Sequence, residues 1–531
     1  MSGIWRASVL IGAGTIVSRL SGFLRAVVLV SAVGATTGAG NAFAIANQLP
    51  NNIYAIISTG LLTAVIVPQI VKAAQHDDGG RAFVSKLFTL GTVVLVVVTA
   101  LATIAAPWLV QLYAPGFPPD QQALATAFAY WCLPQILFYG LYALVGEALN
   151  ARRIFGPFTW APIVNNVVSI AGFLVFIVLF GSDVAVDAWT PQMIALLAGT
   201  ATLGIVVQAV ILLSFWKRTG LHVRPDFRWR GVGLNHLGHL AGWTFLMVVA
   251  GQLAGLVQSR VLSDAAEDYP GVLVTQNAWL LFMLPYSIIV LSIGTPYFTQ
   301  LSEHAAAGRD DDVRGDIGRS IRTLGIFIVI ATAALAAAAV PASRIFTDSR
   351  DEAVAAAGVL LCFLVSLVPL AVLFVIQRTF YAYNDTRTPF FFTLLQCALV
   401  VVTALAASTL PVEYLAAGIA LGQSFASIVQ VILATWLLQR RLGGLRVGSW
   451  MLALGRFALA AVPAAAAGWL TFLLLGGVDG WTVSDKLLGA VGAAIIGIVS
   501  LAVYGGVLAL LRAPELGPAL AIARRLLPGR R

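Results

Sequence analysis

The sequence predicts an all-α, polytopic membrane protein with about fourteen transmembrane helices. Of its 531 residues, 59% are hydrophobic and only 10% are charged, whereas a soluble domain carries about 25% charged residues. Apolar runs long enough to cross a bilayer, about 20 residues each, follow one another along the chain with short polar connections between them. We therefore expect a single integral membrane domain that covers residues 1–531.

The apolar runs define the expected helices. They span residues 7–33, 41–72, 84–112, 121–149, 156–181, 190–216, 232–263, 272–301, 318–345, 353–382, 388–410, 413–438, 449–476 and 485–512. Arg19 and Arg25 interrupt the first run, so we interpret it as a spanning helix and not as a secretory signal. Cys132, Cys362 and Cys397 lie in apolar runs without disulfide or metal-site spacing. We expect no cofactor and no metal.

The positive charges indicate the orientation of the chain. Lys and Arg gather in every second connection, and the connections between them carry acids. Because short cytoplasmic loops are enriched in Lys and Arg, we expect both termini in the cytoplasm. Arg344, Arg350 and Lys486 go against this pattern. The net charge of +9 thus arises mostly from the Lys and Arg residues of the expected cytoplasmic loops. It favours contact with anionic lipid head groups, and no soluble basic domain is present to bind nucleic acid.

An internal repeat divides the chain. At an offset of 234–235 residues, Gln48-Leu49-Pro50 matches Met283-Leu284-Pro285, and Arg25 and Arg260 each lie 25 residues before these prolines. The repeat predicts two six-helix lobes of the same orientation, residues 1–230 and 231–447, followed by helices 13 and 14 and a basic tail at 448–531. Parallel repeats of this kind are a transporter architecture, with the substrate site between the halves near mid-depth.

The segment Ser18-Arg19-Leu20-Ser21-Gly22-Phe23-Leu24-Arg25 is the strongest candidate site. An arginine at mid-depth costs roughly 3 kcal/mol on insertion scales, so such residues usually face a wet cavity and mark a substrate path. Arg260 joins them as the repeat partner of Arg25. Three deep arginines with few deep acids suit an anionic ligand, and pyrophosphate fits best because the guanidinium fork matches phosphate oxygens. The alternative, that the arginines extend to the membrane surface or pair with carbonyls, stays open.

Other polar or helix-breaking residues in the spans complete the candidate set. Further candidates for substrate binding are Ser18, Asn41 and Asn51, and candidates for a cavity or gate are Pro50, Pro285, Gln252, Asn166, Glu147 and Arg378. Asn and Gln also hold helices together, and Glu147 and Arg378 lie close enough to cytoplasmic helix ends to reach the surface. Pro50 and Pro285 predict paired kinks that act as bending points during alternating access.

Enzyme chemistry has little support in the sequence. A membrane glycosyltransferase or phosphatase needs clustered acids, or a His/Asp set, near one membrane face. The acids of this chain are scattered through short loops, and a run such as Asp310-Asp311-Asp312 is typical of a solvated turn. We therefore expect a protein that is not an enzyme.

Five segments resemble the MurJ (MviN) family of lipid II flippases, within the multidrug/oligosaccharidyl-lipid/polysaccharide exporter superfamily. They are SRLSGFLR at 18–25, NAFAIANQLPN at 41–51, AAPWLVQLYAPGF at 105–117, EALNARRIFGPFTWAPIVNN at 147–166 and NDTRTP at 384–389. The resemblance runs through all fourteen expected helices. It implies a flippase that moves undecaprenyl-pyrophosphate-linked peptidoglycan precursor to the outer leaflet. It also implies a two-lobed bundle with a cationic central cavity, in which helices 13 and 14 form a groove for the lipid tail.

This sequence departs from the family pattern at charged positions. Asn41 stands where the resemblance leads us to expect an aspartate, and Tyr54 and Leu280 stand where it leads us to expect arginines. In this respect the chain looks closer to actinobacterial members. Arg260 is a candidate replacement for a lost cation. No sodium site transfers by resemblance, so a coupling cation stays unidentified.

Three alternative functions stay open: a flippase for another polyprenyl-linked glycan, a drug exporter of the same superfamily, and a non-transporting membrane scaffold of cell-wall synthesis. An exporter of cationic drugs needs acids in the cavity, which this chain lacks. The missing family charges favour the scaffold, whereas the retained arginines oppose it. The expected partners are lipid II or a related polyprenyl-pyrophosphate glycan, membrane lipids, and cell-wall synthase and division proteins.

Overall fold

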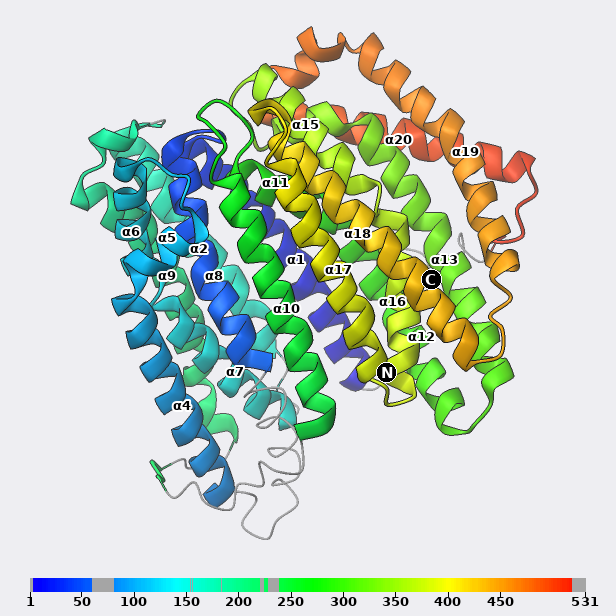
Figure 1. The fold of residues 1–531 in the computed structure, drawn as a ribbon, viewed down its shortest axis with the longest axis horizontal. Coiled ribbons are helices and arrows are strands. Elements are labelled where there is room, and N and C mark those ends of the chain that lie inside the picture. The colour runs from blue at the N-terminus through cyan, green and yellow to red at the C-terminus, as the bar shows by residue number, and fades with distance from the viewer. Residues whose placement is uncertain are drawn as a thin grey trace. The chain divides into compact units, whose positions relative to one another are not determined.

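The structure is a computed structural model that describes residues 3–59, 81–152, 154, 156–182, 184–219, 224–227 and 238–517. Every regular element in this part of the chain is a helix (Figure 1). Thirteen helical stretches among the described residues are long and apolar enough to cross a membrane. The second predicted span begins with α2 (Gly38–Ile57), and its continuation lies outside the described residues. The predicted all-α, polytopic fold is confirmed.

The chain forms two compact units, Met1–Leu273 and Val274–Arg531. The first unit holds α1 (Gly3–Val33), α2, α4 (Arg81–Ile104), α5 (Ala106–Tyr113), α6 (Pro119–Cys132), α7 (Gln135–Ala151), α8 (Gly156–Phe180), α9 (Pro191–Ser214) and α10 (Gly238–Leu262). Within it, α1 packs along α8, α8 packs on α9, and α10 contacts α2 and α5. The predicted lobe boundaries at residues 230 and 447 stay a prediction.

The second unit holds the remaining helices. They are α11 (Val272–Pro285), which begins at the boundary, the π-helical turn η4 (Tyr286–Val290), α12 (Leu291–Ala306), α13 (Asp310–Ala337), α14 (Ala339–Arg344), α15 (Arg350–Leu364), α16 (Leu367–Ala382), α17 (Arg387–Ala407), α18 (Val412–Arg441), α19 (Val447–Leu474) and α20 (Lys486–Leu510). Helix α13 packs on α19, and α19 packs on α20. Two short 3-10 turns, Gly477–Asp479 and Trp481–Val483, join α19 to α20.

Helix breaks occur in the same order in both units. In the first unit α4 gives way to the short α5, and α6 gives way to α7. In the second unit α13 gives way to the short α14, and α15 gives way to α16. Prolines lie at or near these breaks because proline fits the first turn of a helix but not its interior. Pro107 lies in the first turn of α5, and Pro134 directly precedes α7. This shared series of breaks supports the internal repeat.

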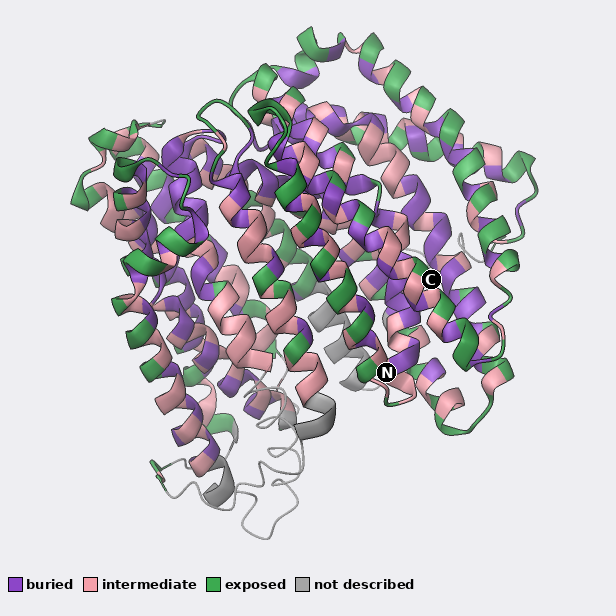
Figure 2. Ribbon diagram, viewed as in Figure 1, coloured by how far each residue is buried: buried purple, intermediate pink, exposed green. Residues whose placement is uncertain are grey.

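The outer surfaces of the helices are apolar. Exposed large hydrophobic side chains include Leu101 and Trp108 in the first unit and Leu459 and Leu474 on α19. Exposed positions recur along the helices of both units, including α19 (Figure 2). Such surfaces are disfavoured in water but suit the hydrocarbon of a bilayer. The exposed apolar faces therefore agree with a multi-pass membrane protein.

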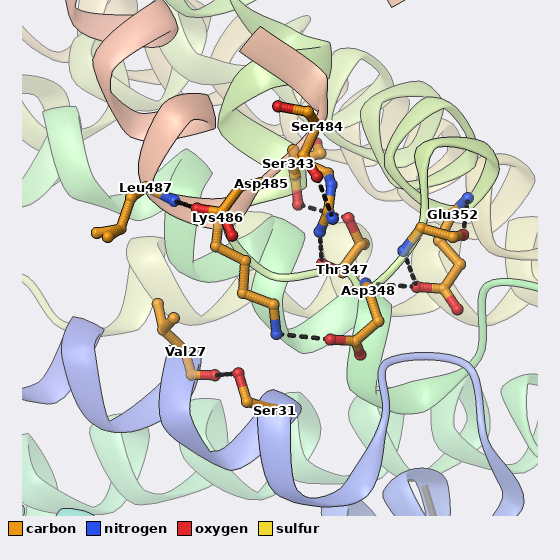
Figure 3. A network of polar contacts seen from close by, with 12 residues as sticks. Val27, Ser31, Ser343, Thr347, Asp348, Glu352, Ser484, Asp485, Lys486 and Leu487 are labelled. Atoms are coloured by element: carbon orange, nitrogen blue, oxygen red, sulfur yellow. Dashed lines mark hydrogen bonds and ion pairs between the residues drawn. The ribbon is translucent and has the colours of Figure 1, made fainter. Parts of the chain in front are cut away.

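The three cations that break the charge pattern all have partners in the second unit. Arg344 is 8% exposed and donates to the carbonyls of Val483 (2.9 Å), Ser484 (3.1 Å) and Thr347. The Lys486 ammonium lies 2.7 Å from Asp348 (Figure 3), and Arg350 lies 3.5 Å from Asp479. We call these three cations and their partners the Arg344 clamp. It joins the α19–α20 connection to the ends of α14 and α15. These charges thus have structural partners, which explains why they depart from the topological rule.

Candidate functional site

The Ser18–Arg25 segment lies within the unbroken helix α1. Arg19 is exposed and Arg25 is half-buried. Six residues separate them, which is about 9 Å along the axis and about two-thirds of a turn in direction. Ser21-Gly22 does not interrupt the helix, and the offset of about two-thirds of a turn directs the two side chains to different sides of it.

Asn166 on α8 fixes this segment of α1. Its side-chain amide donates to the Ser18 carbonyl at 3.2 Å and to the Ser21 hydroxyl at 2.8 Å. The two helices also approach closely at Gly14, where an added Cβ would lie 2.6 Å from Thr159. These contacts give Asn166 and the Ser18 carbonyl a helix-packing role. Their predicted parts in a gate or in substrate binding stay predictions.

Arg25 belongs to a polar cluster formed by three helices. The Tyr139 hydroxyl on α7 lies near the Arg25 guanidinium on α1 and the Asn51 side chain on α2. The Tyr54 and Tyr139 rings are 5.6 Å apart, and the Glu147 carboxylate lies within electrostatic range of Tyr54. We call these five residues the Arg25 cluster. A guanidinium, an amide and two phenol groups can all donate hydrogen bonds to phosphate oxygens.

Tyr139 was not among the residues that the sequence nominated. It lies three residues before Tyr142, so both fall on one face of a mostly apolar helix, and Tyr142 stacks on Phe158 at 4.9 Å. A polar stripe of this spacing inside an apolar span was the available signal. The sequence of α7 alone could not predict which residues of α1 and α2 lie beside Tyr139.

Arg260 lies in the last turn of α10, two residues before the helix ends at Leu262. Its guanidinium donates to the Leu112 carbonyl of α5 at 3.1 Å. Arg25, by contrast, lies eight residues before the end of α1. Arg260 thus lies nearer a helix end than Arg25 does, and its predicted place in a shared cationic cavity stays a prediction. An arginine at a helix C-terminus is favourable because it complements the helix dipole and unpaired carbonyls.

The segment after α10 is held by further contacts within the first unit. Ser263 accepts a hydrogen bond from the Gly116 amide at 3.0 Å, and the Asn41 side chain accepts one from the Leu273 amide at 3.1 Å. Asn41 is 4% exposed, so it caps the start of α11 from inside the unit. We call Arg260, Ser263, Gly116, Asn41 and Leu273 the α10–α11 latch. Gln252 lies half-buried on α10, two turns before the latch.

The prolines differ in their effect on the helices. Pro50 is buried and α2 continues through it. Pro285 ends α11, and the π-helical turn η4 follows. π-Turns are rare and often mark functional positions. Tyr286 lies within electrostatic range of Arg378, whose guanidinium lies over the rings of Phe298 (5.1 Å) and Phe374 (5.3 Å). The residue that follows Pro285 in the sequence therefore lies near Arg378.

An apolar groove opens in the second unit beside this π-turn. Its volume is about 350 Å³. One wall is formed by Leu281, Pro285 and Ile288, and small side chains such as Ala334 on α13 and Ala493 on α20 line the others. The groove has no charged lining residue, so it suits an apolar chain. In the described part of the chain, no three His, Cys, Asp or Glu side chains come together as metal ligands.

A chain with two units of matching helix breaks, cationic side chains within a span and an apolar groove has the architecture of a polytopic membrane transporter. Residues 29–491 match the family model described as lipid II flippase MurJ. The chain belongs to this family.

Individual relatives agree with the family match. The chain is 25% identical over 512 residues to a probable lipid II flippase MurJ of Rhizobium tropici, covering 93% of this chain and 92% of that one. It is 24% identical over 400 residues to the lipid II flippase MurJ of Burkholderia cenocepacia, covering 73% and 75%.

Two solved structures share the fold. A lipid II flippase MurJ in an inward closed conformation has a TM-score of 0.72 at 18% identity, over 92% of this chain and 98% of that one. An inward-facing multidrug resistance transporter of the MATE family has a TM-score of 0.65 at 16% identity, over 83% and 99%.

Proposed function

We propose that this protein is a flippase that carries lipid II, an undecaprenyl-pyrophosphate-linked peptidoglycan precursor, from the cytoplasmic to the outer leaflet of the cell membrane. Membership of the family supports this substrate class. The observation that carries the mechanism is the Arg25 cluster, in which a guanidinium inside a spanning helix has amide and phenol groups beside it. A cation at this depth is costly unless a cavity or an anionic ligand compensates it.

The pyrophosphate is the part of the substrate that the Arg25 cluster recognises. Arg25 supplies a planar fork that matches phosphate oxygens, and Tyr139 and Asn51 supply neutral donors beside it. Arg19, one and two-thirds turns earlier on α1, contacts the same ligand from another side or guides its entry. The polyprenyl tail stays in the membrane, and the apolar groove of the second unit is its docking place, because its lining carries no charge.

Transport proceeds by alternating access, and the α10–α11 latch is one of its gates. The latch consists of single hydrogen bonds from Arg260, Gly116 and Leu273, each of which contributes only about 1 kcal/mol net. Contacts of this strength can break and re-form in every cycle. Pro285 and the following π-turn are the bending point, because the regular helical hydrogen bonds are interrupted there.

The test is lipid II binding and flipping by purified protein in vesicles, corrected for the folded amount. Arg25→Ala removes a charge-assisted contact worth roughly 1.5–3 kcal/mol, so binding should weaken about tenfold to hundredfold. Arg25→Lys should recover only part, because a point charge cannot replace the fork. The matched control is Arg440→Ala, since Arg440 is exposed at the end of α18 over the Trp436 ring. Normal flipping by both Arg19→Ala and Arg25→Ala would exclude the cationic-site mechanism, whereas an absence of flipping by the wild-type protein would favour a non-transporting scaffold.

A variant of Arg260 distinguishes a role of this residue in the gate from a role in binding the ligand. If Arg260 acts in the latch, Arg260→Ala changes the flipping rate while the affinity for lipid II stays normal. If it holds the pyrophosphate, as the internal repeat predicts, its affinity loss should match that of Arg25→Ala. The two outcomes are distinguished by measuring binding and turnover on the same preparation.

The orientation has its own test. With both termini in the cytoplasm, a single cysteine at Glu267 should react with a membrane-impermeant reagent added outside intact cells. A cysteine at Arg446 should react only after the membrane is permeabilised. The opposite labelling pattern would contradict the proposed orientation, in which both termini lie in the cytoplasm.

A further inference from the structure

A small space lies in the second unit between α11, α14 and α15. Its volume is about 10 Å³, which is about the space that one water molecule needs. Most of its lining is apolar, including Leu281 and Phe346, but Asn277, Ser343 and Thr347 also face it. These three polar residues distinguish the space from the dry cavities that apolar side chains alone enclose.

Two polar atoms in this lining lack a hydrogen-bond partner among the described residues. They are the side-chain amide nitrogen of Asn277 and the hydroxyl oxygen of Ser343. Their residues are 7% and 2% exposed, and they come from different helices. A buried donor without an acceptor is strongly disfavoured. Two such groups facing one small space therefore call for a shared partner.

We propose that one buried water molecule occupies this space and bridges α11 to α14. The water accepts a hydrogen bond from the Asn277 amide and exchanges one with the Ser343 hydroxyl. Water fits better than sodium, because the unpaired Asn277 atom is a donor, whereas a hard cation needs oxygen ligands. An apolar molecule would leave both groups unpaired.

The water extends the Arg344 clamp to α11. The Thr347 hydroxyl donates to the Ser343 carbonyl at 3.2 Å, and the Thr347 carbonyl accepts from Arg344. Arg344 in turn binds the carbonyls of Val483 and Ser484 before α20. Leu281 of α11 lines both the water site and the apolar groove. The bridge therefore holds one wall of the groove at a set distance from the α19–α20 connection; that this groove takes a lipid tail rests on the proposed function.

The sign of a stability change tests the proposal. If the water is present, Ser343→Ala removes one of its partners and should lower the melting temperature of the purified protein by about 1–3 °C. The matched control is Ser320→Ala, because the Ser320 hydroxyl is also buried and unpartnered but lines none of the cavities described here. Removing that hydroxyl should leave the melting temperature unchanged or raise it. A Ser343→Ala protein that behaves like Ser320→Ala would overturn the proposal, since the space would then be dry.

A double-mutant cycle and a high-resolution density map provide two independent tests of the bridging water. Asn277→Leu fills the space and displaces the water, so the loss from Ser343→Ala should shrink in the double variant. Density within hydrogen-bonding distance of both atoms in a high-resolution map of the wild type would support the bridge, and an empty space would refute it. If sodium ions stabilised the wild type and Ser343→Ala abolished this effect, a cation and not a water molecule would occupy the space. None of these readouts uses lipid II, so they can fail while the proposed function stands, and the reverse also holds.

Discussion

Removing the Arg344 side chain tests how helices α19 and α20 are joined to the rest of the second unit. Arg344 is 8% exposed and donates to three carbonyls, two of them in the α19–α20 connection about 140 residues away in the sequence. Hydrogen bonds from a charged group contribute about 1.5–3 kcal/mol each, and neighbouring contacts are not additive. We therefore expect Arg344→Ala to lower the free energy of unfolding by about 3–5 kcal/mol.

The other cations of the clamp supply the controls. Lys486 and Asp348 are 2.7 Å apart with side chains 18% and 30% exposed, so Lys486→Ala should cost about 1 kcal/mol. Arg350 and Asp479 are 3.5 Å apart with side chains 44% and 95% exposed, so Arg350→Ala should cost close to nothing. The expected order of destabilisation is Arg344→Ala, then Lys486→Ala, then Arg350→Ala.

The assay is thermal unfolding in detergent, followed by a thiol-reactive dye. The dye suits this protein because Cys132 and Cys397 are buried and unpaired, and they react only when the fold opens. Hydrogen exchange in residues 475–486 gives a local readout that should accelerate in Arg344→Ala. Arg344→Lys should retain part of the stability, because one ammonium cannot serve three separate carbonyls. If Arg344→Ala and Arg350→Ala melt at the same temperature, the buried carbonyl contacts contribute no more than an exposed ion pair, and the reasoning fails.

Three further predictions concern other parts of the chain. Tyr139→Phe keeps the ring but loses the hydroxyl, so lipid II affinity should fall by roughly twofold to tenfold at an unchanged melting temperature; unchanged affinity would remove Tyr139 from the site. Gly116→Ala should impair transport, because an added Cβ would lie 2.1 Å from Asp264 Oδ1 and 2.9 Å from the Ser263 backbone; normal stability and transport would contradict this close contact. Burial, with the hydrogen bond to Asp310 as a second cause, raises the pKa of the Tyr383 hydroxyl above its ordinary value of 10.0. The folded state therefore holds this proton more tightly, and the stabilisation is present below pH 10 and is lost as the pH rises through the folded pKa. Tyr383→Phe should flatten the decline of melting temperature above pH 10, and identical pH profiles of the two proteins would count against this effect.

The acidic run at Asp310–Asp312 shows where a local interpretation is incomplete. The sequence pattern is typical of a solvated turn, but these residues form the first turn of α13, where acids complement the helix dipole. Asp310 accepts a hydrogen bond from Tyr383, and Asp311 pairs with Arg314 at 2.8 Å. Tyr383 lies 73 residues from Asp310 in the chain. No local pattern could identify a partner at that distance.

The cations of the Arg344 clamp also show that the local sequence identifies a residue but not its partner. Their charges mark them in the sequence as exceptions to the topological rule, but each of the three has a partner 129–140 residues away. Only helix packing brings these groups together. The Arg25 cluster is similar, because Arg25, Asn51 and Tyr139 come from three different helices.

The sequence by itself determines the class of protein. A bilayer demands about 20 apolar residues for each span and requires every backbone polar group to be paired within a helix, so composition and run length are enough to predict an all-α polytopic fold. The matching prolines also reveal the repeat, because proline acts on the backbone wherever it stands. What each polar residue does was decided only by tertiary structure. Asn41 caps α11, Asn166 ties α1 to α8, and Arg260 binds the end of α5. An amide or a guanidinium can serve a ligand, a helix end or a neighbouring helix equally well, and the partner that it meets depends on how distant segments pack.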